Sequence, residues 1–552
     1  MKMNCVTGVV TITGVLLGHA AFHASASTVG QGIISDLQGS QFSAKRSVWS
    51  VNKLASTDAI GIYQVPFFRT AQPTVADCSK VVEPCQDEKL LLTQPGMNFV
   101  RQYNQLIQSA EGYVDIASLD SQDGVMLDNI RAALTALARK NKPITVRVMF
   151  GSVPELLNFR VQNSPKSAAD TLKYITQGIP ASSPMKVYVG MYRSGYLGRS
   201  WNHAKILSVD GDSVIIGGVN FLDGDFKSRG YVSDVNPVND MSLGYRGAGL
   251  GVPASKFLDN QWDLVCKQAK DAEKSVLWAA TALWTRGGRP SWDLQRFQNG
   301  NVYETGCPDK LARTFDFVSN HTQQDDPSAD YAISLGRLGD VADWQQDASD
   351  VAQVSMIQRA NSYVRISQQS LYNNALSALD ANTPGYRDVV PFPRKILMAL
   401  CGAMARGVKV QVMTSGEKGH PGAYPYSPPL GREVTYPAYA SISELKGYLV
   451  TFGGCQRGLI DDTRVLEIRT NWNKAAATAD AASFPHFPNH SKVVMVDSLN
   501  KATGQVDGRL VYVGSHNTYD QSHAEYGVIV DSQRFASRFD EEFWQYNWNN
   551  AR

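Results

Sequence analysis

The 552-residue sequence has no strong excess of either charge. Its 53 lysine and arginine residues nearly balance 51 aspartate and glutamate residues, for a formal net charge of +2, and no run of five like charges occurs. A basic stripe is the usual footprint of a nucleic-acid-binding surface, so its absence weighs against a nucleic-acid partner. Hydrophobic residues make up 43% of the chain and aromatic residues 10%, which is enough to fill the cores of two or more domains.

Two common signatures of catalytic and metal sites are also missing. No Gly-x-Ser-x-Gly segment occurs, which leaves a serine lipase without support. No Cys-x-x-Cys pair or Cys/His cluster suggests a zinc site.

The first 26 residues are typical of an export signal. Lys2 gives a short positive region, residues 6–17 are mainly apolar, and Ala24, Ser25 and Ala26 form a small-residue cleavage site. An uncleaved membrane anchor is the alternative, but the stretch is short and contains several polar residues. We therefore expect cleavage near Ala26 and a secreted or periplasmic protein.

Cleavage would remove Cys5 and leave an even number of cysteines. In an exported protein, six cysteines favour disulfides over free thiols. Six cysteines allow 15 connectivities, so pairing between sequence neighbours is only the simplest of several hypotheses. It pairs Cys78 with Cys85, Cys266 with Cys307, and Cys401 with Cys455.

The sequence contains an internal duplication. Residues 107–116 match residues 357–366 at six of ten positions. A chance match is the alternative, but a similar succession of helix-like and strand-like segments follows each copy. Each copy follows a helix-like segment and is expected to continue as a strand. The expected helices are 99–109, 127–138, 351–359 and 395–405, and the strands expected after the copies are 144–150, 186–191, 408–413 and 465–469.

This pattern predicts a mixed α/β fold of two homologous lobes. The predicted limits are a signal peptide at 1–26, a first lobe at 27–310, a connector at 311–348 and a second lobe at 349–552. The connector is assigned because the region between the halves is polar and irregular.

The same short motif occurs once in each half. It comprises Asn202, His203, Lys205 and Asp210 in the first half, and Asn489, His490, Lys492 and Asp497 in the second. Side chains at positions i and i+2 of a strand project from one face, so a strand would bring each His beside its Lys. The Asp falls on the opposite face, and we expect it to have a structural role in a turn or hydrogen bond.

An apolar strand is expected to return beside each motif. The Asp-Gly pair at 210–211 is a tight-turn signal, after which 213–220 runs back to Asn220. In the second half a longer loop precedes 509–517, which runs back to Asn517. Each return strand therefore brings an asparagine close to a histidine.

Glycines in the return strands and the repetition itself favour a functional site. Gly218 and Gly514 lack side chains and are expected to leave room for a ligand at the backbone. A lone His in a strand is more often an ordinary core or surface residue, and one His-x-Lys pair arises readily by chance. Two copies with the same Asp spacing and a terminal Asn, in duplicated halves, are not explained in that way.

The paired motifs resemble the HKD motifs of the phospholipase D superfamily. Segments at 201–205, 236–240, 366–369 and 407–410 are similar to the compact, secreted enzymes of the actinomycete type, over most of the mature chain. The resemblance implies one bilobed globule in which both motifs meet at the lobe interface. His516 before Asn517 and a Tyr- and Pro-rich segment at 419–439 depart from that type, so headgroup preference does not carry over.

Cleavage of a phosphodiester needs positive charge near the phosphoryl oxygens, a neutral nucleophile and a proton donor. Lys205, Lys492, Asn220 and Asn517 are expected to hold the nonbridging oxygens, and no metal or other cofactor is expected. One histidine would attack phosphorus and the other would protonate the departing alcohol.

The sequence is symmetric and does not choose between the two histidines, since an imidazole takes either role. The resemblance implies that His203 is the nucleophile and His490 the acid and base. Asp240 and Glu525 occupy matching places after the two asparagines, and each is expected to hold the far nitrogen of a histidine. A solvated acid at the start of a strand is the alternative.

The resemblance implies a phospholipid substrate at a membrane or micelle surface, cleaved to phosphatidic acid and free headgroup, with transfer to alcohols. Aromatic residues at 191–201 and 419–439 are candidates for contact with lipid, although self-packed surface loops are equally common. A nuclease with the same motifs is the main rival. A membrane-bound lipid synthase and a non-catalytic lipid-binding protein are weaker ones, and we expect a monomer.

Overall fold

The computed structural model of the chain describes most of the two predicted lobes. The described residues are 27–40, 48–54, 56–65, 95–119, 124–151, 168–194, 200–221, 238–247, 250–268, 276–287, 290–295, 308–309, 330–339, 347–372, 392–415, 425–426, 434–435, 440–470, 489–499, 503, 506–518 and 523–551. Within these ranges, no helix combines the length and apolar character needed to cross a membrane. The predicted signal peptide lies outside them.

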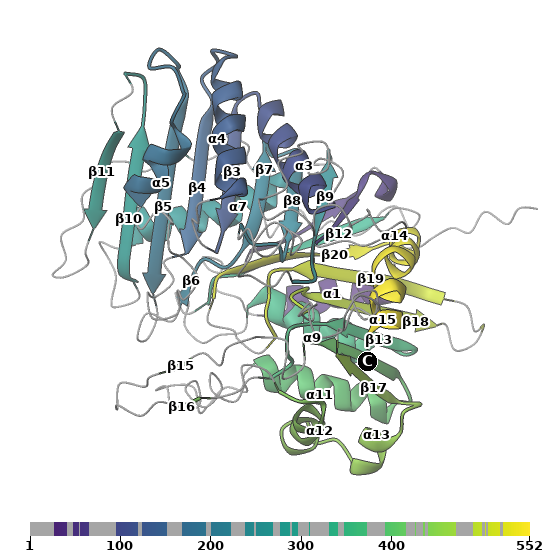
Figure 1. The fold of residues 1–552 in the computed structure, drawn as a ribbon. Helices are drawn as coiled ribbons and strands as arrows, with labels where there is room; N and C mark the ends of the chain where they lie inside the picture. Colours follow the sequence, from purple (N-terminus) through teal and green to yellow (C-terminus); the bar gives the residue numbers. More distant parts are fainter. Residues whose placement is uncertain are drawn as a thin grey trace, which may run out of the picture.

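Two large mixed sheets form the framework (Figure 1). The ten-stranded sheet runs in the order β11 (Pro290–Gln295), β10 (Val276–Trp284), β5 (Lys186–Ser194), β4 (Thr145–Gly151), β3 (Tyr113–Ser118), β7 (Lys205–Val209), β8 (Ser213–Gly217), β9 (Asp240–Arg246) and β2 (Gly61–Val65), with β6 (Ser200–Trp201) beside β5. The eight-stranded sheet runs β1 (Val48–Lys53), β12 (Tyr331–Arg337), β20 (Glu525–Asp531), β19 (Val506–Gly514), β18 (Val493–Leu499), β13 (Tyr363–Ser367), β14 (Lys409–Thr414) and β17 (Leu466–Thr470). Each sheet with its helices is called the first or second lobe.

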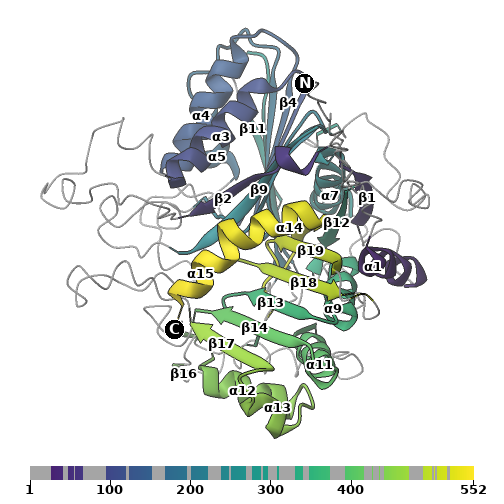
Figure 2. The same ribbon diagram turned by 90° about the vertical axis from the view of Figure 1, so that its right-hand side faces the viewer.

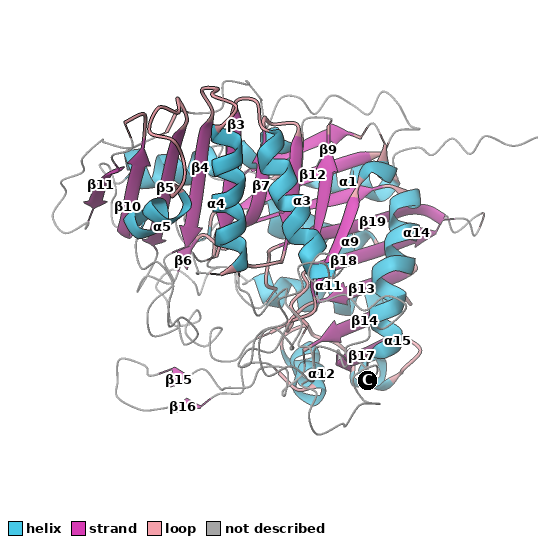
Figure 3. Cartoon of the chain, turned by 45° about the horizontal axis from the view of Figure 1, so that its top comes forward, coloured by secondary structure: helices cyan, strands magenta, loops and turns pink. Residues whose placement is uncertain are grey.

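Helices cover both faces of each sheet. In the first lobe α3 (Pro95–Ser109), α4 (Val125–Ala138) and α5 (Ala168–Ile175) lie on one face and α7 (Gly251–Asp263) on the other (Figures 2 and 3). In the second lobe α1 (Thr28–Gly39), α9 (Ala348–Arg359), α11 (Phe392–Ala405), α12 (Ile442–Thr451) and α13 (Arg457–Asp461) lie on one side, and α14 (Gln533–Phe539) and α15 (Gln545–Asn550) on the other. These layers confirm the predicted α/β class.

The local sequence explains why these elements form. In α4 the buried residues recur at helical spacing, and include Met126, Ile130, Leu134 and Leu137. All six residues of β3 are buried, as expected for a central strand covered on both faces. At the start of α12, Ser441 and Glu444 form a reciprocal capping box that satisfies free backbone N–H groups.

The two sheets repeat the same strand order over seven positions. The series β5-β4-β3-β7-β8-β9-β2 in the first lobe corresponds to β17-β14-β13-β18-β19-β20-β12 in the second. In both series the first three strands are parallel and the next three are antiparallel. The duplication seen in the sequence is therefore a duplication of the fold, and β7 and β18, which follow the two His-x-Lys motifs, occupy equivalent central places.

The second sheet takes in segments from outside the predicted second lobe. Residues 28–53, predicted in the first lobe, supply α1 and β1, and residues 331–337, predicted in the connector, supply the inner strand β12. β12 pairs with β20 on one side and β1 on the other, so both of its edges are hydrogen-bonded. The predicted limits missed this because β1 and β12 are far apart in sequence.

The lobes share a hydrophobic core. One cluster joins residues of α7, such as Phe257, to residues of the second lobe, such as Phe539 and Trp544. The rings of Phe257 and Tyr526 lie 5.2 Å apart across this boundary. The two lobes therefore pack as one body, with β20 in contact with β7 and β8 of the first lobe.

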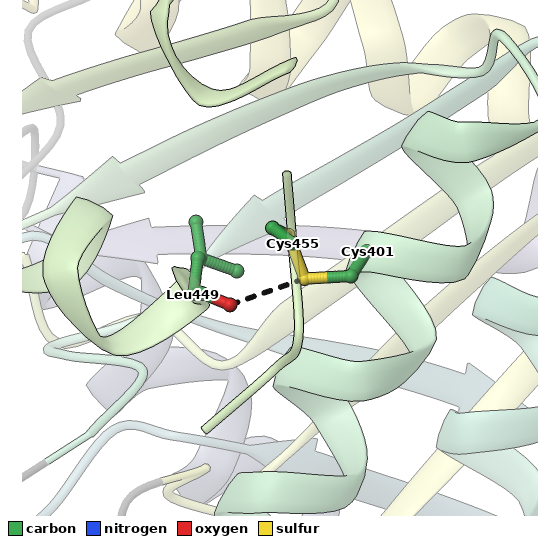
Figure 4. Close-up of a disulfide and its surroundings, with 3 residues drawn as sticks. All are labelled: Cys401, Leu449 and Cys455. Carbon is green, nitrogen blue, oxygen red and sulfur yellow. Dashed lines mark hydrogen bonds between the residues drawn. A yellow bond between two sulfur atoms is a disulfide. The ribbon is translucent and has the colours of Figure 1, made fainter. Parts of the chain in front are cut away.

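One predicted disulfide is present in the described part of the chain. Cys401 of α11 is bonded to Cys455, which follows α12, and Cys401 Sγ lies 3.4 Å from Leu449 O (Figure 4). Cys266 is also disulfide-bonded. Cys78, Cys85 and Cys307 lie outside the described residues, so the other two predicted pairings stay predictions.

Candidate active site

The backbone at the start of each His-x-Lys motif is hydrogen-bonded to backbone of the opposite lobe. The His203 N–H donates to Ala524 O at 2.8 Å, and Asn202 forms a parallel bridge with Ala524. In the second motif the His490 N–H donates to Asn239 O at 2.7 Å, and Asn489 forms the matching bridge with Asn239. Both histidines therefore precede the regular strands β7 and β18, and lie where the lobes meet.

Each histidine is hydrogen-bonded to a carboxylate that belongs to the opposite lobe. His203 Nδ1 lies 2.9 Å from Glu525 Oε2 and 3.0 Å from Oε1, and His490 Nδ1 is hydrogen-bonded to Asp240 Oδ2. Ala524, which precedes Glu525, lies beside Asn202, which precedes His203. In the same way Asn239, which precedes Asp240, lies beside Asn489, which precedes His490. The structure thus brings both predicted carboxylates to histidines, each supplied by the other half of the chain.

The asparagines that precede the histidines were part of the repeated motif, but sequence reasoning gave them no role. Asn202 Nδ2 donates to Ser118 O at 2.7 Å, and Asn489 Nδ2 donates to Gln368 O and Met413 O at 3.0 Å each. These carbonyls belong to the C-terminal ends of parallel strands or the residue just after one. The asparagines therefore tie each motif to its sheet, and their repetition before both histidines was the available signal.

Both motif lysines lie against their own histidines. Lys205 Nζ donates to His203 O at 2.6 Å, and Lys492 Nζ donates to His490 O. Lys492 Nζ also lies 2.8 Å from His490 Nδ1 and 3.9 Å from Asp240 Oδ2. Both lysines are buried, so their charge acts on the site with little screening by water.

The predicted asparagines Asn220 and Asn517 follow β8 and β19 at equivalent places, and both are buried. Asn517 Oδ1 accepts no hydrogen bond from the described residues. A phosphate contact by either amide remains a prediction.

Burial and charge set the protonation of the first histidine. The pKa of His203 is lowered to about 3, chiefly by burial; the Glu525 carboxylate raises the pKa and offsets burial only in part, and Lys205 lowers it. Burial raises the pKa of Glu525, but His203 and the Arg337 guanidinium outweigh burial and hold this pKa below its usual range. Because an ionised carboxylate only accepts hydrogen bonds, neutral His203 carries its proton on Nδ1 and leaves the Nε2 lone pair available.

Comparison with known proteins agrees with this geometry. Residues 354–548 match the family model described as cardiolipin synthase, PLD-like domain. The chain is 26% identical to phospholipase D of Streptomyces antibioticus over 467 residues, which cover 80% of this chain and 75% of that protein. Residues 354–548 therefore match a PLD-like domain, and most of the chain is similar to a phospholipase D of the actinomycete type.

A solved structure shows the same fold. The crystal structure of phosphatidylserine synthase from Haemophilus influenzae Rd KW20 superposes with a TM-score of 0.53 at 12% identity, over 95% of this chain and 91% of that one. At this identity the likeness concerns the fold alone. It extends over both lobes, whereas the family model matches the second half of the chain.

The aspartates of the two HKD motifs lie in structural positions. The Asp210 carboxylate accepts hydrogen bonds from three consecutive backbone N–H groups at 111–113, at 2.8 to 2.9 Å. Asp497 lies 3.4 Å from Arg509 Nε, across the β18–β19 hairpin. Within the described part of the chain, neither aspartate is hydrogen-bonded to a histidine, in keeping with a structural role.

The glycines of the HKD return strands do not leave room for a ligand, contrary to expectation. A Cβ atom on Gly218 would lie 2.1 Å from Asp240 Oδ1, and one on Gly514 would lie 2.2 Å from Tyr512 Oη. The space beside each backbone is already filled by protein atoms. Gly218 is required instead because the carboxylate that holds His490 packs directly against it.

Several neighbours of the first HKD histidine were also missed. Ser515 Oγ donates to Glu525 Oε2 at 2.5 Å, and Arg337 Nη2 lies 3.5 Å from Glu525 Oε1. The His523 ring lies 4.2 Å from the Trp201 ring and 5.5 Å from that of His203. Arg337 gave no signal because it falls in the predicted connector. The aromatic segment 419–439 lies almost wholly outside the described residues, so its role is untested.

Proposed function

We propose that this enzyme hydrolyses the distal phosphodiester of glycerophospholipids such as phosphatidylcholine, giving phosphatidic acid and free headgroup. The observation that carries the proposal is the pair of histidines, each held at Nδ1 by a carboxylate of the opposite lobe. This arrangement directs each Nε2 away from its carboxylate and supplies two imidazoles to one reaction. The likeness to a named phospholipase D supports lipid as the substrate class.

In the first step, His203 Nε2 attacks phosphorus and forms a P–N bond while the P–O bond to the headgroup breaks. His490 gives its proton to the departing headgroup oxygen. Glu525 stabilises the cationic ring that His203 becomes once it carries the phosphoryl group. The assignment of His203 as nucleophile is supported by the neutral state that burial imposes on it.

The negative charge on the phosphoryl oxygens must be balanced as phosphorus becomes five-coordinate. Lys205 and Lys492, buried beside the two histidines, supply positive charge, and Asn220 and Asn517 supply amide donors. No residue outside this set of four is needed for the clamp.

In the second step, His490 removes a proton from an acceptor hydroxyl, and that oxygen displaces His203 from phosphorus. Water as acceptor gives phosphatidic acid, whereas an alcohol gives a new phosphodiester. The likeness to a protein named as a phospholipase D supports water as an acceptor. We propose hydrolysis as the main reaction, with transfer to alcohols beside it.

Export of the enzyme is part of the proposal. The signal-like segment at 1–26 predicts it, and the buried Cys401–Cys455 disulfide is typical of an oxidising compartment. We propose a secreted or periplasmic monomer that acts on phospholipid at a membrane or micelle surface.

Product analysis distinguishes the proposed lipid activity from a nuclease. Purified enzyme is given mixed phospholipids or DNA, and products are identified by mass spectrometry. We expect phosphatidic acid and free headgroup from lipid, and a loss of at least about 10³-fold in His203→Ala and in His490→Ala, because the two act as one unit. Arg464→Ala, at an exposed side chain, serves as the control.

Cleavage of DNA with lipid left intact would replace the lipid assignment by the nuclease alternative. Ordinary activity in both histidine variants would overturn the mechanism. Phosphate trapped on His490, with His203 dispensable, would reverse their roles.

A further inference from the structure

The two histidine–carboxylate pairs have different surroundings although their own geometry repeats. On the strand beside each carboxylate, the residue directly opposite Glu525 is Arg337, whereas the residue opposite Asp240 is Val65. The strands β12 and β2 that carry these residues occupy equivalent places in the two sheets. A buried cation therefore stands at one carboxylate, and an apolar side chain takes that position at the other.

A second difference lies one residue beyond the return strands. Ser515 follows β19 and donates from Oγ to Glu525 Oε2 at 2.5 Å. Its counterpart after β8 is Gly218, where any side chain would collide with the Asp240 carboxylate. Glu525 is thus supported by a guanidinium and a hydroxyl, and neither has a counterpart at Asp240 among the described residues.

Arg337 is itself held in place. It is fully buried, with Nη1 3.2 Å from Asp350 Oδ1 and Nη2 3.5 Å from Glu525 Oε1. Asp350 lies in the first turn of α9 and also faces the charge of Lys395. The result is a chain of alternating charge that ends at the carboxylate of Glu525.

We propose that Arg337 is a positioning residue that assigns the two histidines their roles, by holding Glu525 ionised and cancelling its pull on a proton at His203. His203 then rests neutral and ready to attack, while His490, whose Asp240 faces Val65, keeps the proton that the leaving group takes. The assignment of His203 as nucleophile and His490 as acid rests on the proposed function. The effect of Arg337 on the protonation of His203 is independent of that function.

The physical argument is a balance of charges around His203. A carboxylate beside an imidazole favours the charged ring, and a guanidinium on the far side of that carboxylate opposes it. The other charged or titratable groups facing His203 are Lys205, His523 and His516. A motif lysine stands beside each histidine, so the lysines do not distinguish the two, and Arg337 does.

Titration of the histidine rings by NMR in the resting enzyme tests the proposal without substrate. The His203 signal is assigned from its loss in His203→Asn. In Arg337→Met we expect the midpoint of His203 to move up by about one to two pH units, because the Glu525 carboxylate would then act on the ring without an opposing unit charge. Arg337→Lys should restore most of the shift, and Asp350→Asn should move the midpoint in the opposite direction.

Arg147→Met provides a matched control. Arg147 is also a buried arginine between two carboxylates, Asp115 at 2.7 Å and Asp259 at 2.6 Å, but it contacts neither histidine in the described residues. It should destabilise the protein and leave the His203 midpoint in place. If Arg337→Met does not fold, the double variant with Asp350→Asn removes both buried charges, and Ser515→Ala tests the second support of Glu525.

Activity measurements then connect the titration to catalysis. The acidic limb of the kcat/KM profile on phosphatidylcholine should move up with the His203 midpoint in Arg337→Met and return in Arg337→Lys. An unchanged His203 midpoint in Arg337→Met would overturn the proposal, and so would a double variant with the same midpoint as Asp350→Asn alone. An enzyme with the expected titrations but no action on phospholipid would instead overturn the proposed function.

Discussion

At the scale of single residues, the stability of the fold depends on pH because His203 is buried with its imidazole ring neutral. Its pKa falls from an ordinary value near 6.5 to about 3 in the folded protein, chiefly because of burial. Between these values the unfolded chain binds a proton that the folded chain does not, so stability falls as pH falls. Glu525, whose pKa is also held below its usual range, acts in the same direction at lower pH.

We therefore expect the free energy of unfolding to fall by a few kcal/mol, an order-of-magnitude figure, between about pH 6.5 and about pH 3. Urea unfolding at a series of pH values measures this slope. His203→Asn keeps a neutral polar neighbour for Glu525 and should flatten the slope above pH 5. A variant with the same slope as the wild type would show that other groups carry the dependence.

At the scale of elements, the turn after β8 fixes the Asp240 carboxylate at the start of β9. A Cβ atom on Gly218 would meet Asp240 Oδ1 at 2.1 Å, so Gly218→Ala must push the carboxylate that holds His490. We expect kcat to fall by about 10-fold to 100-fold, because an error near 1 Å in catalytic geometry has effects of this size. Steady-state kinetics on phosphatidylcholine provides the measurement.

Gly447→Ala is the control for that substitution. Gly447 lies within α12 with no atom within 4 Å of an added Cβ, so alanine should stabilise the helix by about 0.5 to 1 kcal/mol and leave kcat unchanged. Full activity in Gly218→Ala would mean that catalysis does not depend on the exact position of the Asp240 carboxylate.

Some helices and strands could be predicted from the sequence, and others could not. The helices α3, α4, α9 and α11 and the strands β3, β4, β5, β13, β14 and β17 were all predicted, because duplicated helix–strand periodicity is a local signal. The strands β2 and β12 were missed because each pairs with a strand far away in sequence. Arg337 was missed with β12, since nothing local indicates that its neighbour across the sheet is Glu525.

The histidines, lysines and asparagines could be found from the repeated motif alone, but not the partner of each histidine. Asp240 and Glu525 sit at matching places in both halves, and that symmetry fits pairing within a half or between halves. Only the bridges of Asn202 with Ala524 and of Asn239 with Asn489 decide for pairing between halves. Such contacts depend on how the lobes pack, and this is not encoded in any short segment.

At the scale of the whole molecule, the Cys401–Cys455 disulfide stabilises the second lobe without touching the site. It joins residues 54 apart and is buried in the core beneath α11 and α12. In the chain-entropy model a loop of this length contributes about 4 kcal/mol, so Cys401→Ala with Cys455→Ala should lower the unfolding free energy by a few kcal/mol and leave kcat unchanged. Denaturant unfolding and nonreducing peptide mapping, which also tests the other two predicted pairs, check this.

A site assembled from both lobes has a consequence for the acceptor of the second step. In the proposed mechanism, the phosphatidyl group on His203 remains bound until a hydroxyl comes within reach of His490. Each histidine is held at the boundary between the lobes by a carboxylate of the other lobe. Water and a small primary alcohol each present a single hydroxyl, so the base acts on both. Ethanol added to a phosphatidylcholine assay should therefore yield phosphatidylethanol beside phosphatidic acid.

The stereochemistry at phosphorus tests whether the reaction passes through a covalent intermediate on His203. Two in-line displacements, first by His203 and then by the acceptor oxygen, each invert phosphorus and together retain its configuration. A substrate made chiral with oxygen isotopes, analysed by ³¹P NMR of the phosphatidylethanol, reports the outcome. Because the histidines form one unit, Asp240→Asn and Glu525→Gln should slow water and alcohol transfer in the same proportion. Inverted phosphorus without phosphatidylethanol would mean that water attacks the lipid directly, which removes the covalent step while leaving a phosphodiesterase.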